Sequence, residues 1–213
     1  MAVHYQTRGL IVKKSERGEA DQIFNIYTEN FGKLNILGRG IRKSASKLLG
    51  GADLFYLSDI QFIQGRSQKI LTDAALIENY SVIRQNPDKM KIAHQIADTL
   101  NVLVANEEKD LQIWRLLNEV FNKLNNCRNG KLQIIYYYFF WNLAAILGYQ
   151  PELTSNSLGR ELIDGDLAKI LKLLFQKNWP ILTRLKIESS HYELLKNTSE
   201  CYNKNTIAVN YEK

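Results

Sequence analysis

The spacing of the apolar residues changes near residue 80, and this change constrains the fold more than any other feature of the chain. Before it, short runs rich in Ile, Leu, Val and Phe alternate with polar turns, as in β-strands. The sequence predicts five strands, over residues 8–12, 22–28, 33–38, 54–64 and 69–77. Five antiparallel strands within about 75 residues would leave open edges, so we expect a small closed or nearly closed β-barrel.

Beyond residue 80 the apolar residues recur every three or four positions, which is the period of an α-helix. Asn86 followed by Pro87 is a good helix start, because Asn caps a helix and Pro suits its first turn. We expect a first helix from this point that carries Ile92, Ile96, Leu100 and Leu103 on one face, and further helices over 109–125, 132–147, 166–176 and 189–202. The helix over 132–147 is apolar nearly all round and belongs in the middle of a bundle. Residues 151–165 are predicted to be a polar loop, and the tail from Asn203 has no core to join.

These patterns predict an α+β chain, with a five-stranded barrel over residues 1–80 and a helical bundle domain over 81–213. The composition, 45% hydrophobic and 23% charged over 213 residues, excludes a disordered, collagen-like or disulfide-scaffold protein. The longest apolar run, 134–146, is interrupted by Asn142 and is shorter than the roughly 18–20 residues that span a bilayer. With no signal-peptide pattern and two distant cysteines, Cys127 and Cys201, we expect a soluble protein of a reducing cytoplasm.

A basic stretch follows the third predicted strand and is the strongest functional signal. Between residues 33 and 47 there are cations but no Asp or Glu. Gly38 and Gly40 let a main chain approach a phosphate closely, and the ligand face of a five-stranded barrel lies on its second and third strands and the adjoining loops. We therefore predict a nucleic-acid site, widened across a later turn by two more cations, made of Lys33, Arg39, Arg42, Lys43, Lys47, Arg66 and Lys69. The alternative is a solvated loop without a ligand.

Other functional patterns are weaker. The three histidines lie on different predicted elements, and no nucleophile, metal-ligand or phosphate-loop motif occurs, so we expect no catalysis. Aromatic residues of the barrel are candidates for base stacking, but strand alternation sends about half such residues into the core; they are Tyr27, Phe31, Phe55 and Tyr56. The aromatic run 136–141 cannot form one stacking face, because successive helix positions point about 100° apart. We expect that run to be core.

Several short motifs occur in a fixed order along the chain. They are Arg8-Gly9-Leu10-Ile11-Val12, Gly18-Glu19-Ala20-Asp21, Thr28, Gly32-Lys33, Gly38-Arg39-Gly40-Ile41-Arg42-Lys43 with Ser46, and Leu147-Gly148-Tyr149-Gln150-Pro151-Glu152-Leu153. No single motif is very specific, but the ordered set resembles the RecO family of recombination mediator proteins of bacterial DNA repair. The resemblance runs from the first strand to about Leu153, and the remainder matches only as helices.

The resemblance implies an N-terminal OB-fold and a C-terminal helical domain, with no catalytic residues and no cofactor. Proteins of this family bind single- and double-stranded DNA, anneal complementary strands, and help load the RecA recombinase onto DNA coated by single-strand-binding protein. The implied partners are RecR, often RecF, and the acidic C-terminal tail of single-strand-binding protein, with RecA as an indirect partner and no membrane. The implied location is the cytoplasm, at the nucleoid. Carried over by position, the basic residues of the OB-fold are Lys33, Arg39, Arg42 and Lys43.

The chain departs from the family pattern in one place. Many members hold a four-cysteine zinc site just after the Leu-Gly-Tyr-x-Pro segment, whereas residues 154–160 here contain no Cys or His. A closed tetrahedral zinc site needs four such ligands, so we expect no zinc, and any partner docking that depends on that site is in doubt. Two other functions stay open: an adaptor whose basic stretch meets an acidic peptide, and an RNA-binding OB-fold module.

Overall fold

The computed structural model describes residues 3–43, 46–104, 107–127, 131–151, 157–158, 161–162, 165–177, 179–184 and 187–203. The chain forms two compact units, Met1–Arg115 and Leu116–Lys213. The change from strands to helices near residue 80 therefore falls inside the first unit. The domain division at that point stays a prediction.

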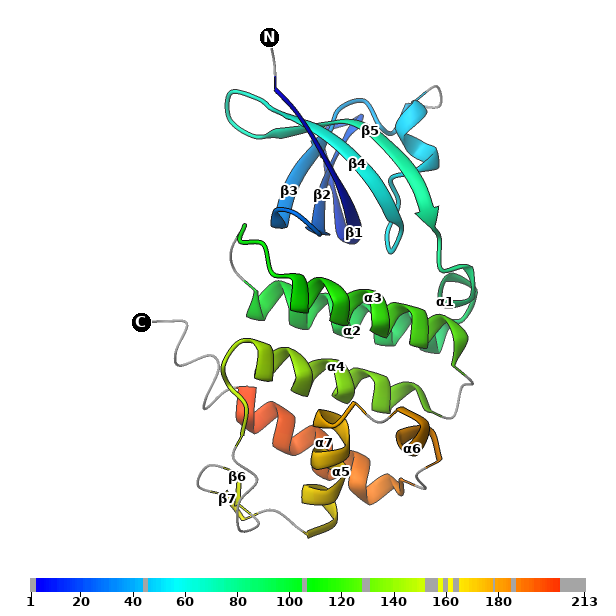
Figure 1. Cartoon of the computed structure of the whole chain (residues 1–213). Helices are drawn as coiled ribbons and strands as arrows, with labels where there is room; N and C mark the ends of the chain where they lie inside the picture. Colours follow the sequence, from blue (N-terminus) through cyan, green and yellow to red (C-terminus); the bar gives the residue numbers. More distant parts are fainter. Residues whose placement is uncertain are drawn as a thin grey trace. The chain divides into compact units, whose positions relative to one another are not determined.

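The first unit contains a closed five-stranded barrel (Figure 1), which confirms the predicted fold class. Its strands follow the spatial order β1-β2-β3-β5-β4, and the neighbours pair antiparallel except β3 and β5, which are parallel. This is a five-stranded OB-type barrel. The strands are β1 (His4–Arg17), β2 (Asp21–Thr28), β3 (Gly32–Gly38), β4 (Leu57–Gln64) and β5 (Lys69–Glu78).

Strand β1 is long enough to pair with two neighbouring strands of the barrel. Its first half pairs with β4, from His4 to Leu10, and its second half pairs with β2, up to Arg17. The pairing with β2 shifts register between Ile11 and Lys13, just after the pairing with β4 ends at Leu10. A β-bulge causes such a shift and bends the strand. The sequence predicted only residues 8–12 because the run after Val12 is polar and exposed.

The barrel core is built from the inward-facing residues of all five strands. Phe24 and Ile26 of β2 and Ile36 of β3 are completely buried. Because side chains alternate between the two faces of a strand, each of these elements contributes every second residue to the interior. Tyr5, Phe31 and Phe62 close one part of this core, with Tyr5 stacked on Phe62 at 5.2 Å between ring centroids.

The connection from β3 to β4 differs from the prediction. It contains a 3-10 turn, η1 (Lys47–Gly50), and β4 begins at Leu57 rather than at Leu54. Phe55 takes a positive φ of 60° there, and its N–H donates to the Ile11 carbonyl at 2.8 Å. The apolar residues at 54–57 suggested a strand, but this tight turn carries Phe55 into the core instead.

Helices α1, α2 and α3 are the first to follow the barrel along the chain. Helix α1 (Ser81–Gln85) was not predicted, whereas α2 (Pro87–Leu103) begins where Asn86-Pro87 predicted. The Asn86 side chain accepts from the N–H groups of Asp88 and Lys89 at 3.0 and 3.1 Å, which caps α2. Helix α3 (Leu111–Asn126) starts at a second cap, Asp110, and the division between the two compact units falls within α3.

The second unit is helical around α4 (Leu132–Ile146), which is buried on nearly every side as predicted. The polar break in its sequence, Asn142, donates from Nδ2 to the carbonyls of Tyr138 and Leu174, at 2.8 and 3.2 Å. It thereby joins α4 to the next helix. The further helices are α5 (Gly165–Phe175), α6 (Trp179–Arg184) and α7 (Ser189–Tyr202).

The loop predicted for residues 151–165 is partly wrong. Two short strands, β6 (Ser157–Leu158) and β7 (Glu161–Leu162), pair antiparallel within it. Helix α6 was also missed, because a helix of six residues is too short to show a clear helical period. The tail from residue 204, and most of the 154–160 region where a zinc site was considered, lie outside the described residues. No helix in the described ranges is long and apolar enough to cross a membrane.

Candidate nucleic-acid interface

The basic stretch after β3 is fixed to the barrel rather than free in solvent. Ile41, in the middle of the stretch, is completely buried in the barrel core. The Gly40 N–H donates to Asp21 Oδ1 at 2.7 Å, and the Arg42 N–H donates to the Ala20 carbonyl at 3.0 Å. Gly40 has a φ of +60°, which favours glycine at this bend. The main chain is therefore held in place while the side chains of Arg39, Arg42 and Lys43 are exposed.

This stretch lies beside the turn between β1 and β2, and that turn also contacts the turn between β4 and β5. The first contact is made by the two hydrogen bonds just described, and the second by Arg17, whose Nη1 donates to Gln68 Oε1. Five-stranded barrels of this type bind ligands on the face of their second and third strands and with the β1–β2 and β4–β5 loops. Five exposed cations lie on the three connections or directly beside them, and we call them the turn cations: Arg17, Arg39, Arg42, Lys43 and Arg66.

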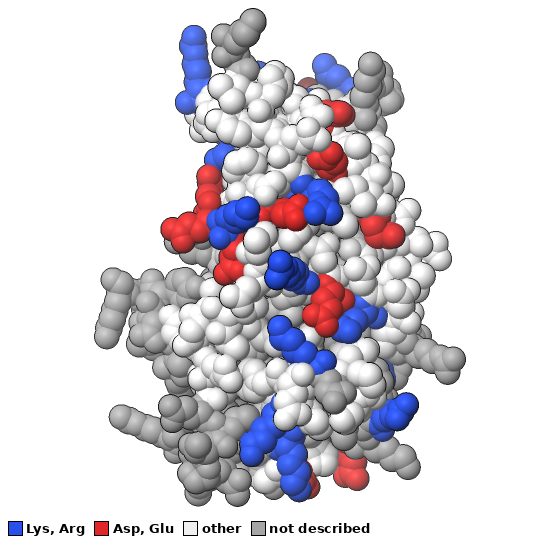
Figure 2. Space-filling view, in the orientation of Figure 1, with Lys and Arg blue, Asp and Glu red and all other residues white. Residues whose placement is uncertain are grey.

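Most turn cations make no ion pair with a carboxylate in the part of the chain that the structure describes. Among the described residues, only Arg42 of the five makes an ion pair, with Glu16 at 3.3 Å, and both side chains are exposed, by 39% and 69%. Exposed pairs of this kind contribute little to stability, so these cations are available to an anionic ligand. In the view of Figure 2, positive and negative side chains are interspersed, so the net charge of +6 is not gathered on that face.

Two of the predicted site residues face protein instead. Lys33 Nζ donates to the main-chain carbonyl of Asn101 at 2.9 Å, and burial lowers the pKa of Lys33. Lys69 Nζ contacts both carboxylate oxygens of Glu107, at 2.8 and 2.7 Å. The side chain of Lys47 lies outside the described residues. DNA contacts by these three lysines stay predictions, and the geometry gives Lys33 and Lys69 a packing role.

The segment after α2 covers part of the outer face of β2 and β3. Gly32, with a φ of +64°, lies so close to Glu108 that an added Cβ would be 2.2 Å from the Glu108 carbonyl oxygen. Tyr27 is completely buried, and its hydroxyl lies 3.4 Å from the Asp110 carbonyl oxygen. This part of the strand face is therefore covered, whereas the turn cations are exposed.

None of the four candidate stacking aromatics is exposed. Tyr27 and Phe55 are completely buried, and Phe31 packs edge-on against Phe62 with centroids 5.6 Å apart. Tyr56 lies under the guanidinium of Arg84, 4.7 Å from the ring centroid. These positions favour a packing role for the four aromatics over base stacking. In the run 136–141, every residue but Tyr136 is buried, which confirms that the run is core.

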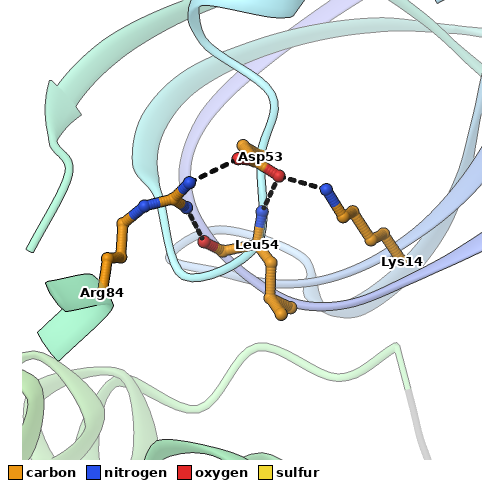
Figure 3. Close-up of polar contacts among 4 residues, drawn as sticks. All are labelled: Lys14, Asp53, Leu54 and Arg84. Carbon is orange, nitrogen blue, oxygen red and sulfur yellow. Dashed lines mark hydrogen bonds and ion pairs between the residues drawn. The ribbon is translucent and has the colours of Figure 1, made fainter. Parts of the chain in front are cut away.

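A charged cluster fixes the β3–β4 connection and α1 to the barrel (Figure 3). Asp53 binds Lys14 of β1, and it also binds Nη2 of Arg84 in α1 at 2.7 Å, while the second Arg84 nitrogen donates to the Leu54 carbonyl at 2.7 Å. Burial alone would raise the pKa of Asp53. Hydrogen bonds from Lys14, Arg84 and the Leu54 N–H outweigh it and hold that pKa below its ordinary value. All of these charges are partnered, so we assign the cluster a structural role.

Sequence reasoning missed Arg17, although a signal was present. Arg17 ends the polar run after Val12 and directly precedes the turn at Gly18. A polar strand end next to a turn is a place where a side chain reaches a ligand surface. In the described part of the chain, no three His, Cys, Asp or Glu side chains gather as a metal ion would need.

Comparison with known families agrees with this architecture. Residues 1–80 match the family model described as Recombination protein O N terminal, and residues 84–166 match the model described as Recombination protein O C terminal. The chain belongs to the RecO family. The first RecO match contains all five strands of the barrel and the turn cations, and the second contains α2, α3 and α4.

Curated relatives named DNA repair protein RecO occur in several bacteria. The relative from Gloeothece citriformis is 28% identical over 167 residues, which cover 77% of this chain and 58% of the relative. The relative from Acetivibrio thermocellus is 28% identical over 153 residues, covering 71% of this chain and 60% of the relative. The chain therefore spans about three fifths of the length of these RecO proteins.

Proposed function

We propose that this chain is a DNA-binding protein of recombinational DNA repair that binds single- and double-stranded DNA and anneals complementary single strands. The observation that carries the proposal is the set of turn cations held on an OB-type barrel in a chain of the RecO family. The relatives named DNA repair protein RecO support the repair role.

Binding of DNA by the turn cations would be a phosphate interaction. Each Lys or Arg that neutralises a phosphate releases condensed counterions, which favours binding and makes it weaken with salt. The buried Ile41 and the fixed main chain at Gly40 and Arg42 support tight contact, because a surface that is already ordered loses little entropy on binding. The absence of exposed stacking aromatics among the four barrel candidates favours recognition of the backbone over recognition of the bases.

Annealing follows from the same chemistry. Two complementary strands repel each other through their phosphates, and cations that neutralise those phosphates lower this repulsion when the strands meet. No covalent bond is made or broken in this process. We therefore propose a binding activity and no enzymatic one.

We further propose that the chain helps load the RecA recombinase onto DNA covered by single-strand-binding protein. RecR and RecF are the proposed direct partners, together with the acidic tail of single-strand-binding protein. A basic surface is suited to an acidic tail, since opposite charges steer association. Candidate contacts on the second unit are three exposed lysines with no ion pair in the described part of the chain: Lys172, Lys177 and Lys196.

The test is binding of the full chain to a fluorescent single-stranded oligonucleotide at several salt concentrations, in parallel with a duplex and an RNA of matched sequence. The proposal predicts binding to both DNA forms that weakens steeply with salt, and faster pairing of complementary strands when the protein is added. Exclusive binding of the RNA would favour an RNA-binding module. Absence of binding to all three at low salt would contradict the proposal and favour the adaptor.

A further inference from the structure

Glu16 is a carboxylate placed inside the proposed DNA-binding surface. In the strand pairing it lies opposite Gln22 of β2, and Gln22 lies opposite Gly38, the residue before Arg39. Its side chain is 69% exposed and reaches Arg42 Nη1 at 3.3 Å. An acidic residue at this point is unfavourable for a surface that binds phosphates, so its presence calls for a physical explanation.

The main chain of Arg42 is fixed independently of this ion pair. The Arg42 N–H bonds to Ala20, and the preceding Ile41 is buried in the core. Removing the Glu16 carboxylate therefore leaves the basic stretch in place and changes only the partner of the guanidinium. The pair orients the side chain of Arg42 and does not serve to hold the loop.

We propose that Glu16 is an internal competitor for the phosphate that Arg42 binds, so that DNA binding exchanges the Glu16 carboxylate for a phosphate oxygen on the same guanidinium. This inference rests on the proposed function and assigns Glu16 a role in setting DNA affinity. A guanidinium binds carboxylates and phosphates with the same N–H donors, and Glu16 contacts Nη1 of Arg42, so a phosphate that binds at Nη1 displaces the carboxylate. The competitor weakens binding and makes release of the DNA easier.

The structure supplies a matched control for Glu16. Glu19 lies three residues further on, in the turn that follows β1, is exposed, and makes no ion pair among the described residues. Glu16→Gln and Glu19→Gln remove the same charge near the same surface. Only the first removes a partner of Arg42, so the difference between them separates competition from general repulsion of DNA.

The experiment measures the Kd of the full chain for a fluorescent single-stranded oligonucleotide at fixed low salt, for the wild type, Glu16→Gln, Glu19→Gln, Arg42→Ala and Glu16→Gln/Arg42→Ala. We expect Glu16→Gln to tighten binding about two- to fivefold, as the loss of an exposed ion pair allows, and to exceed the effect of Glu19→Gln. In the Arg42→Ala background, Glu16→Gln should tighten DNA binding by no more than Glu19→Gln does in the wild-type chain. Circular dichroism checks that each variant is folded.

Two results would overturn the role of Glu16 while leaving DNA binding intact. One is equal effects of Glu16→Gln and Glu19→Gln, and the other is a full Glu16→Gln gain in the Arg42→Ala background; both indicate general repulsion. If the wild type binds no DNA, the proposed function itself fails, and the competitor role fails with it.

Discussion

Lys33 Nζ and the main-chain carbonyl of Asn101 are joined by a hydrogen bond of 2.9 Å, so a cation of β3 is bound to the end of α2. The charge of Lys33 is partly buried, which lowers its pKa. A lysine in this position stabilises the contact between the strand and the helix more than it serves a ligand. This distinguishes it from the turn cations, which are exposed.

We predict that Lys33→Met and Lys43→Met change different properties of the protein, stability in the first case and DNA affinity in the second. Lys33→Met should lower the free energy of unfolding by about 1 kcal/mol, the usual net contribution of one hydrogen bond, with little change in DNA affinity. Lys43→Met should weaken DNA binding with little change in stability, because its side chain is exposed. Chemical unfolding and oligonucleotide binding measure the two effects. A strong loss of DNA affinity in Lys33→Met, at unchanged stability, would indicate that Lys33 contacts DNA.

The close contact between Gly32 and Glu108 gives a second prediction. Gly32→Ala should destabilise the first unit by about 3 kcal/mol or more, since it combines a left-handed backbone with a Cβ placed 2.2 Å from a carbonyl oxygen. Gly18→Ala is the control, because Gly18 has a φ of +62° but no atom within 4 Å of the added Cβ. It should cost only about 1–2 kcal/mol. Equal losses of stability for the two variants in thermal unfolding would mean that the segment after α2 moves away from residue 32 at little energetic cost.

The low pKa of Asp53 predicts a dependence of stability on pH. Its pKa in the folded protein lies below the ordinary value of 3.8, so the ionised carboxylate stabilises the fold fully above that value. The contribution is lost as the pH falls through the lower folded pKa. We expect Asp53→Asn to be less stable than the wild type at neutral pH, by about 1–2 kcal/mol, and the difference to shrink below pH 3.8. Unfolding by urea across this range tests it, and a difference independent of pH would contradict it.

The fold could be predicted well from the sequence because its signals are local. Alternating residues in the strands and the Asn86 cap act over a few positions, and both are confirmed. The second half of β1 was missed because it is polar. It is polar because it is exposed and ends beside a turn, outside the core. The turn at 53–56 was missed because its apolar residues also fit a strand.

The site was harder to predict because side-chain partners depend on tertiary packing. The sequence shows a dense basic stretch beside glycines, and the structure leaves the side chains of Arg39, Arg42 and Lys43 exposed there. That these side chains bind DNA stays a prediction. It could not show that the end of α2 would bind Lys33, or that the segment after α2 would bind Lys69, since Asn101 and Glu107 are far away along the chain. It also gave no sign that Arg17 would reach the β4–β5 turn.

If the turn cations bind the phosphates of DNA, the salt dependence of binding reports how many of them make contact. The measurement compares the full chain with a variant in which three turn cations are replaced by glutamine: Arg39, Arg42 and Lys43. A control variant loses the same charge on the second unit, at three exposed lysines that the binding surface does not include: Lys172, Lys177 and Lys196. The quantity measured is the slope of log K against log salt for a single-stranded oligonucleotide.

Each phosphate contact contributes about 0.7 to the magnitude of this slope for single strands. We predict that the first variant loses about 2 from the slope and binds much more weakly, while the control keeps the wild-type slope. An unchanged slope in the first variant, or the same loss in both variants, would contradict the claim that DNA binds at the turn cations.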